Sequence, residues 1–290
     1  MISTFLDSLQ FEKRSSSHTI TAYKTDLEQF SKYLILQYEV SQPETATAAM
    51  MRSWIVSLME AKLSPVSVNR KIASLRAFYG YLRKRNLIEK DPTKTLSALK
   101  TRKKLPVYVE EKSMELLFET DLFQQDFSGF RDLIIMELLY GSGIRLSEMI
   151  GLTLSDVDLP GKTIRVLGKR AKERLIPLSS MLINLLTRYL TERAPEEDTD
   201  ALILTDSGKA AYPVFIQRTV KKYLSAVTTL SQKSPHVLRH TYATHLLNRG
   251  ADLNAIKELL GHATLAATQM YTHNSIEKLK KTHQQAHPKA

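Results

Sequence analysis

Five residues of this chain have the types needed to break a phosphodiester bond without a metal ion: Arg145, His236, Arg239, His262 and Tyr271. A tyrosine can serve as the nucleophile, arginines can hold the phosphate oxygens, and histidines can move or steady protons. If the fold brings these residues together, we expect the protein to cut and rejoin a nucleic-acid backbone.

Arg145 lies in the segment GSGIRLSEMIGL, residues 141–152, where two glycines should end one helix. We expect Ser142 or Gly143 to cap the next helix, which would put Arg145 near a helix N-terminus, where anions are favoured. Glu148 follows three residues later, shares the same helix face and could orient Arg145. The local sequence equally allows a plain surface ion pair between these two residues.

A basic hairpin supplies the next candidate. Residues 163–167 and 174–178 are short β-branched or apolar runs joined by the sequence GKRAKE, a pattern that predicts a β-hairpin with a basic tip. Lys169 at this tip is suited to protonate a leaving 5′ oxygen, because a lysine gives up its proton readily when its surroundings lower its pKa. A solvated basic turn without a catalytic role is the alternative.

His236 and Arg239 share one face of a predicted helix in the segment HVLRH. His240 lies one turn from His236, a spacing that also suits zinc, but the segment lacks the general-base glutamate of such motifs and carries Arg239 instead. We therefore expect no metal site here, and the sequence predicts no cofactor. One of the two histidines could also be hydrogen-bonded in the core.

Two further candidates follow the next predicted helix. Gly261 should end that helix and leave His262 on a loop, where its side chain can point outward. Tyr271 lies near the end of a short predicted helix, where a tyrosine more often packs than reacts. A phenol with a pKa of about 10 becomes a good nucleophile only beside cations and a base. The arginines and histidines named above are candidates for both roles.

The chain has 290 residues and a formal net charge of +11, which favours a polyanionic partner such as nucleic acid. Residues 1–104 hold 18 Lys and Arg against 9 Asp and Glu, so they carry most of the excess, although a solvated basic face would give the same count. Cysteine is absent, no signal peptide is visible, and no apolar run approaches the roughly 18 residues of a membrane span. We therefore expect a cytoplasmic protein without disulfides or membrane contact.

The first part of the chain predicts a compact helical bundle. Its four predicted helices cover residues 3–13, 19–38, 45–61 and 66–85. The fourth helix is basic, as is the end of residues 89–106, which read as an interdomain linker, so we expect both to contact DNA. The candidate contacts are Arg70, Lys71, Arg76, Lys103 and Lys104.

The pattern restarts after the linker and predicts a larger domain of helices and strands. Besides the hairpin, helices are expected at residues 112–118, 127–142, 180–192, 212–228, 236–249, 253–260, 263–271 and 275–283. The predicted fold class is mainly α with a small β-sheet. An all-α domain would cover residues 1–88, the linker residues 89–106, and an α+β domain residues 107–290.

Long segments along nearly the whole chain resemble the tyrosine site-specific recombinases of the phage integrase family, most closely the Xer branch. FLDSLQFEKRSSSHTITAYKTDLEQF and SPVSVNRKIASLRAFYGYL resemble the helical core-binding (SAM-like) domain of that family. YGSGIRLSEMIGL, VLGKRAKERLIPL, SPHVLRHTYATHLLNRGADLNAIKELLGH and TQMYTHNSIEKLKKTHQQAHP resemble its catalytic domain. Two departures are Arg170, where the family commonly has glycine, and ATLAATQM after His262, which is usually richer in serine. Neither departure removes a catalytic residue type.

The resemblance implies a role for each principal candidate. Tyr271 would attack the scissile phosphate and form a 3′-phosphotyrosyl link, while Arg145 and Arg239 would hold the non-bridging oxygens. Lys169 would protonate the departing 5′ oxygen, and His236 would help to accept the tyrosine proton. Neither ATP nor a metal would be required, because the covalent link conserves the energy of the broken bond.

The same resemblance implies supporting residues and partners. His262 would contact the phosphate or support the tyrosine, and Glu148 would orient the site. Four protomers would act on two double-stranded DNA segments as a homo- or hetero-tetramer, with a paralogous recombinase or a DNA translocase as further partners. The basic segment 275–290 would dock on a neighbouring protomer, unless it is a frayed terminus.

Other functions remain open on the sequence. An integrase or transposase of a mobile element would share the chemistry. Such proteins often add an N-terminal arm-binding domain, and this chain begins directly with the core-binding helices, which disfavours that variety and leaves a simple transposon integrase open. A DNA-binding regulatory protein with unused catalytic residues is disfavoured by the complete set, and a metal nuclease using His236 and His240 would lose activity in EDTA. The favoured function is a site-specific recombinase that resolves chromosome dimers at segregation.

Overall fold

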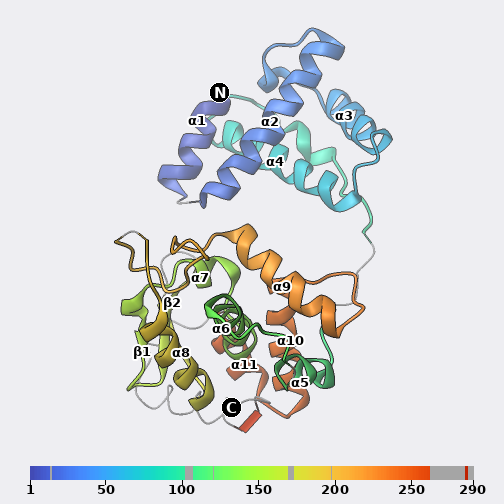
Figure 1. Ribbon diagram of the computed structural model, residues 1–290. Coiled ribbons are helices and arrows are strands. Elements are labelled where there is room, and N and C mark those ends of the chain that lie inside the picture. The colour runs from blue at the N-terminus through green and yellow to red at the C-terminus, as the bar shows by residue number, and fades with distance from the viewer. Residues whose placement is uncertain are drawn as a thin grey trace. The chain divides into compact units, whose positions relative to one another are not determined.

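The computed structural model describes residues 1–13, 15–101, 107–119, 121–168, 173–196, 198–261 and 285–286. The chain divides into two compact units, unit 1 over Met1–Lys104 and unit 2 over Leu105–Ala290, and each is described by itself (Figure 1). Unit 1 is helical and unit 2 combines helices with one small sheet, which confirms the predicted fold class.

The described residues of unit 1 form four α-helices and three short helical turns. These are α1 (Ile2–Asp7), continued by the π-helix η1 (Ser8–Glu12), then α2 (Ser17–Tyr38), the 3-10 turn η2 (Pro43–Thr45), α3 (Ala48–Glu60), α4 (Pro65–Lys84) and the 3-10 turn η3 (Pro92–Thr95). Ser16, Thr47 and Ser64 cap α2, α3 and α4, because each side chain accepts the backbone N–H three residues on.

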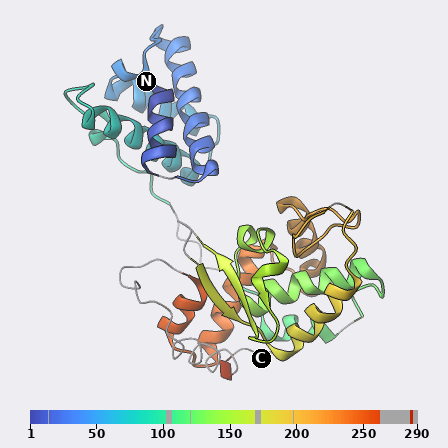
Figure 2. The ribbon, with the colours of Figure 1, turned by 90° about the vertical axis from the view of Figure 1, so that its left-hand side faces the viewer.

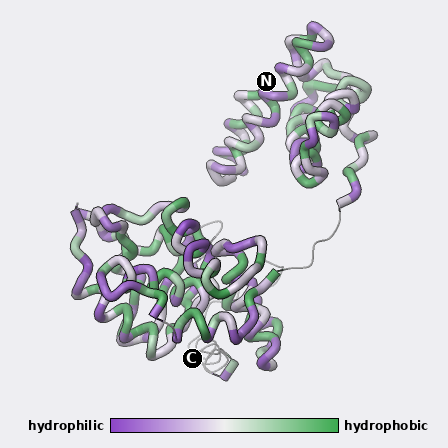
Figure 3. The backbone as a smooth tube through the Cα atoms, turned by 45° about the vertical axis from the view of Figure 1, so that its right-hand side comes forward, coloured by the Kyte–Doolittle hydropathy of each residue, from purple (hydrophilic) through white to green (hydrophobic). Residues whose placement is uncertain are grey.

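An aromatic core holds these helices together. Phe5, Phe30 and Phe78 are fully buried and Trp54 nearly so. The rings of Phe30 and Trp54 lie 4.9 Å apart, and those of Phe5 and Phe78 meet edge to face at 5.6 Å. Figure 3 shows hydrophobic and hydrophilic residues alternating along the helical tubes, as expected for helices that bury one face.

Part of the segment predicted as a linker belongs to unit 1. The Asn69 side chain on α4 donates to the carbonyl of Leu99 at 2.9 Å and accepts its N–H at 2.8 Å. Arg76 donates to the carbonyl of Leu96, whose side chain is buried in the aromatic core. These contacts attach residues 91–99 to α4. The bounds of the linker, residues 89–106, stay a prediction.

Unit 2 is arranged around one buried helix. Its elements are α5 (Glu111–Glu119), α6 (Phe127–Ser142), α7 (Leu146–Ile150), the 3-10 turn η4 (Leu154–Asp156), β1 (Val157–Asp158), β2 (Thr163–Leu167), β3 (Glu173–Pro177), α8 (Ser180–Glu192), α9 (Pro213–Val227), α10 (Pro235–Asn248) and α11 (Leu253–Leu260). Most residues of α6 are buried, and α8, α9 and α10 pack around it (Figure 1).

The three strands form an antiparallel sheet in the order β1-β2-β3. Val166 on β2 pairs with Arg174 on β3, and Ile164 pairs with Ile176, so these four side chains lie on the buried face. Figure 2 shows the strands beside the orange helices, and α11 contacts β3 directly. The sheet therefore carries an arginine into the interior of unit 2.

The predicted bounds of three helices, residues 127–142, 180–192 and 253–260, agree with α6, α8 and α11. The predicted cap of α7 was wrong: Gly143 ends α6 in a left-handed conformation, and Arg145 is the residue before the first turn of α7. The predicted helices at 263–271 and 275–283 lie outside the described residues. In the part of the chain that the structure describes, no helix is long and apolar enough to cross a membrane.

Candidate active site

The turn between α6 and α7 sets the position of Arg145. Gly143 has a φ of +62°, and a Cβ atom there would lie 2.5 Å from a ring carbon of the buried Tyr242. Only glycine allows both the left-handed backbone and this close approach. The backbone of Arg145 is then extended, with φ −78° and ψ 153°, and its side chain leaves from the N-terminal end of α7.

Glu148 is buried beneath Arg145 and binds it at two points. One carboxylate oxygen accepts the Arg145 side chain at 2.6 Å, and the other accepts the Arg145 backbone N–H at 2.8 Å. The pair is more than a surface contact, because the Glu148 side chain is only 3% exposed against 30% for Arg145. Burial alone would raise the pKa of Glu148, but hydrogen bonds from Arg174 and Arg145 lower it to about 2, so the carboxylate is ionised.

Arg174 is a member of the site that the sequence analysis missed. Its two terminal nitrogens bind both oxygens of Glu148 at 2.9 and 2.8 Å, and its Nε donates to the carbonyl of Leu259 at 3.0 Å. The side chain is buried. A signal was present in the sequence, because Arg174 shares the strand face of Ile176 and must therefore point inward.

Arg239 comes from α10 and is also buried. Its guanidinium donates to the carbonyls of Gly143 and Leu260, both at 2.5 Å. Burial, followed by the positive charge of Arg145, lowers the pKa of Arg239 to about 10. Arg239 thus ties the α6–α7 turn to the end of α11.

The C-terminal end of α11 gathers the three arginines. The carbonyls of Leu259, Leu260 and Gly261 accept hydrogen bonds from Arg174, Arg239 and Arg145 respectively, the last at 3.2 Å. The last carbonyls of a helix have no partner within the helix and carry partial negative charge, so cations are favoured there. The cluster of Arg145, Arg174, Arg239 and Glu148, called the arginine cluster below, has two more positive than negative charges and can attract an anion.

The two histidines of the HVLRH segment lie outside the core. His236 is exposed at the start of α10, one turn before Arg239. His240 is half-buried, and burial, together with the charge of His236, lowers its pKa. The alternative in which one of these two histidines is hydrogen-bonded in the core does not hold, because His236 is exposed and His240 is only half-buried. Among the described residues, no group of His, Asp and Glu could hold a metal ion.

The core histidine of α10 is instead His245. Its Nε2 bonds the carbonyl of Val109 at 2.9 Å and must donate, so its Nδ1 accepts from the Tyr140 hydroxyl at 3.0 Å. Burial lowers the pKa of His245, which fits this neutral form. Thr241 accepts the N–H of the same Val109 at 2.9 Å. Both backbone groups of Val109 are therefore fixed to α10, and His245 has a structural role.

Three predicted catalytic residues, Lys169, His262 and Tyr271, lie outside the described residues. The described chain nevertheless shows where their segments begin. Residues 169–172 connect β2 to β3, two positions before Arg174, and His262 follows Gly261 directly. The first segment therefore leads to Glu173, the neighbour of Arg174. The second follows Gly261, whose carbonyl binds Arg145.

The predicted DNA contacts of unit 1 differ in their exposure. Arg70 and Arg76 are exposed on α4. The structure differs from the prediction for Lys71, whose side chain is buried. Its ammonium donates to Asp26 at 2.8 Å and to Gln29 at 2.5 Å. An ammonium used in this way is not available to a phosphate. Lys103 and Lys104 lie outside the described residues.

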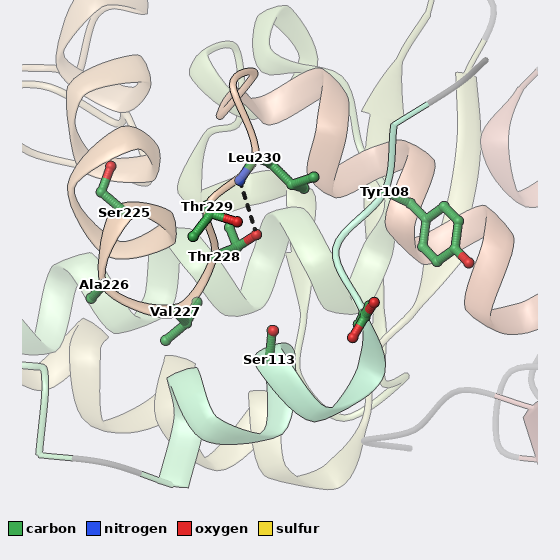
Figure 4. A pocket seen from close by; sticks show the side chains of 9 residues that line it. Tyr108, Ser113, Ser225, Ala226, Val227, Thr228, Thr229 and Leu230 are labelled. Carbon is green, nitrogen blue, oxygen red and sulfur yellow. Dashed lines mark hydrogen bonds between the residues drawn. The ribbon is translucent and has the colours of Figure 1, made fainter.

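A hollow in unit 2 lies away from the arginine cluster. It is a shallow hollow of about 460 Å³ between the start of α5 and the end of α9. Figure 4 shows the hydroxyls of Ser113, Ser225 and Thr228 around it, with Leu230 donating its N–H to Thr228. No arginine or lysine lines this hollow, so it lacks the charge that an anionic substrate needs.

Comparison with known proteins gives two family matches. Residues 107–278 match the model of the phage integrase family, and residues 2–86 match the phage integrase N-terminal SAM-like domain. Among curated relatives, the tyrosine recombinase XerC of Chlorobaculum parvum is 36% identical, over 99% of this chain and 94% of that protein. The tyrosine recombinase XerC of Listeria innocua is 37% identical, over 99% of this chain and 97% of that protein.

Solved structures show the same fold. The XerH site-specific recombinase, bound to its palindromic difH substrate in a post-cleavage complex, aligns with a TM-score of 0.73 and 22% identity, over 97% of this chain and 83% of that one. The integrase of the Tn1549 transposon, bound to transposon right-end DNA, aligns with a TM-score of 0.71 and 22% identity, over 97% of this chain and 98% of that one.

Proposed function

Because the chain belongs to the phage integrase family and is a tyrosine recombinase, we propose that it cuts double-stranded DNA at a specific site and rejoins it through a 3′-phosphotyrosyl link to Tyr271. The observation that carries the proposal is the arginine cluster, in which Arg145 and Arg239 are held side by side on the carbonyls of Gly261 and Leu260. A phosphate oxygen that gains charge in the transition state needs such prearranged cations.

The two phosphate-binding arginines retain donors for a substrate. A guanidinium has five N–H donors, and the hydrogen bonds described above use two of those of Arg145 and two of those of Arg239. Arg145 is partly exposed, so it would meet the phosphate from the solvent side, while Arg239 would approach from within the protein. Glu148 would keep Arg145 in place without filling its remaining positions.

The chemical step we propose is a transfer of the phosphoryl group. The Tyr271 hydroxyl loses its proton with the help of His236, and its oxygen forms a bond to phosphorus as the bond from phosphorus to the 5′ oxygen breaks. Lys169 gives a proton to that 5′ oxygen, and His262 supports the phosphate. A 5′-hydroxyl of the exchanged strand then reverses the step, so one phosphodiester replaces another and no ATP is consumed.

We propose that the biological role is the resolution of chromosome dimers, with four protomers on two duplexes and action in the cytoplasm. The relatives named XerC support the Xer assignment. The positive charge of residues 1–104 and the exposed Arg70 and Arg76 would supply phosphate contacts, so DNA affinity should fall steeply as salt rises.

A nicked suicide substrate tests the chemistry. Cleavage beside the nick releases a short fragment, which prevents religation, so a covalent protein–DNA adduct should accumulate with the wild-type chain. Tyr271→Phe should bind the DNA equally well and form no adduct, and wild-type activity should survive EDTA. A wild-type chain that binds its site and never forms the adduct would instead be a regulatory DNA-binding protein.

A mobile-element integrase is the second candidate, because the Tn1549 transposon integrase shares the fold. The bound DNA sequence, recovered by selection from random duplexes, separates the two roles. A match near the replication terminus supports dimer resolution, whereas a match flanking the gene of this chain supports mobility.

A further inference from the structure

Arg174 is buried in the arginine cluster and has no role in the chemical step described above. Three of its N–H groups are used inside the protein, two on Glu148 and one on the carbonyl of Leu259. Its side chain is only 4% exposed, against 30% for Arg145. Arg145 is therefore open to solvent, whereas the hydrogen bonds of Arg174 are directed into the protein.

Stability is a weak reason for such a residue. Removing two charges from water is costly, and apolar side chains of similar size often stabilise a core as well or better. The positions of the partners point to another role. Arg174 joins β3 to α7 through Glu148 and to the end of α11 through Leu259, so it connects three separate elements with one planar group.

We propose that Arg174 is a positioning residue for the phosphate-binding arginine, an inference that rests on the proposed function. It occupies both oxygens of Glu148, which leaves Arg145 one side-chain contact to that carboxylate. The second terminal nitrogen of Arg145 turns instead to the carbonyl of Gly261. Without Arg174, the Arg145 guanidinium would settle on Glu148 with both nitrogens and withdraw from the substrate.

Arg174 also links strand β3 to the end of helix α11. It stands two positions after residues 169–172, which contain Lys169, and it binds the carbonyl three residues before His262. A shift of β3 relative to α11 would therefore be resisted by the same side chain that orients Glu148.

The test compares Arg174→Gln and Arg174→Lys with Arg165→Gln. Arg165 is the matched control because it lies on the neighbouring strand β2, is 46% exposed and pairs with Asp156 on the surface. At saturating enzyme, the Arg174 variants should form the covalent adduct about 100-fold more slowly, the effect of a misplaced group. Their DNA affinity should match that of the wild type, and Arg165→Gln should retain both affinity and rate.

A double-variant cycle separates positioning from a general loss of structure. If Arg174 acts through Arg145, adding Arg174→Gln to Arg145→Ala should slow adduct formation little further. Independent, multiplicative losses would overturn the proposal. So would wild-type rates in both Arg174 variants, or failure of both to fold while Arg165→Gln folds.

The failure of the proposed function would look different. In that case the wild-type chain and Arg165→Gln would form no adduct on the selected DNA site, and the inference would fall with it. If only the inference fails, wild type and Arg174→Lys react at the same rate. The conservative Lys variant keeps the charge and loses the two parallel hydrogen bonds. If Arg174→Gln does not fold, the rate of adduct formation in Arg174→Lys therefore tests whether Arg174 positions Arg145.

Discussion

Each unit of this protein contains a buried carboxylate that lies between two cations and can be compared with its counterpart in the other unit. In unit 1, Asp26 accepts Arg70 and Lys71, and in unit 2, Glu148 accepts Arg145 and Arg174. In both clusters one cation is buried and the other is an arginine that reaches solvent. The Arg70 side chain is 47% exposed, against 6% for Lys71.

The clusters differ in where the cations come from. Arg70, Lys71 and Ser74 all lie on α4, so the Asp26 network joins only two helices, α2 and α4. The partners of Glu148 lie on α7 and β3, and they bind carbonyls at the end of α11 as well. The same pairing of charges fixes helix packing in unit 1 and assembles a site from distant segments in unit 2.

A single fluorescent residue makes the comparison measurable. The chain has one tryptophan, Trp54, which is buried in unit 1 with the Lys71 ammonium 6.0 Å from its ring. Trp54 fluorescence therefore reports the unfolding of unit 1, while circular dichroism of the whole chain reports both units.

The largest effect should follow Glu148→Gln. Arg174 would then be buried beside a neutral partner, which should destabilise unit 2 by about 3–5 kcal/mol. Adduct formation should also slow about 100-fold, because Arg145 loses its orientation. Circular dichroism in urea should show an earlier transition, while the Trp54 transition stays in place. Glu192→Gln is the control, since Glu192 pairs with Arg188 on the surface of α8.

Asp26→Asn should give an equal loss of stability without the loss of chemistry. Lys71 would be buried without its counter-charge, so the Trp54 transition should move by about 3–5 kcal/mol. The rate of adduct formation in fully bound complexes should match the wild type. Glu28→Gln on the same helix is the control, because its pair with Lys24 is exposed and 3.9 Å long. A slower rate in bound Asp26→Asn complexes would remove the distinction between the clusters.

Acid should remove the contribution of Glu148 to the stability of unit 2. Its pKa falls from 4.5 to about 2 in the folded protein, so its stabilising effect is complete above pH 4.5 and is lost as pH falls toward 2. The stability gap between wild type and Glu148→Gln, measured by circular dichroism in urea, should narrow over this range. A constant gap would show that folding does not lower the pKa of Glu148.

Arg70→Gln should have the smallest effect on stability. Asp26 keeps Lys71, and the Arg70 side of the pair is half exposed, so we expect a loss of about 1 kcal/mol. If Arg70 also meets a phosphate, the salt dependence of DNA binding should weaken by about one unit of slope. An unchanged slope would restrict Arg70 to packing within unit 1.

Local patterns predicted much of the fold, because helices depend on the spacing of nearby apolar residues. Residues 180–192, for example, were predicted as a helix, and α8 has those bounds. They also selected Arg145, Glu148 and Arg239, which the structure brings together. Arg174 was missed, and the burial of Lys71 was not predicted, because their partners, Glu148 and Asp26, lie far away in sequence.

One sequence pattern, shared by Lys71 and Arg174, could have predicted that both side chains are buried. Lys71 precedes Ser74, Leu75 and Phe78 by three, four and seven residues, so it belongs to the buried stripe of α4. Arg174 lies two residues before Ile176, so both are on the buried face of β3. A charged residue in register with apolar ones predicts a buried partner of opposite charge, although the sequence does not say which.

The two glycines beside the arginine cluster limit how this sequence can vary. A Cβ at Gly143 would meet the Tyr242 ring, and one at Gly261 would lie 3.1 Å from the Arg174 side chain. Both residues also have a positive φ. A random-mutagenesis screen for inactive variants should therefore return Gly143 and Gly261 together with the reacting residues. Their loss of activity would come from displaced backbone, so such a screen would map the shape of the site as well as its chemistry.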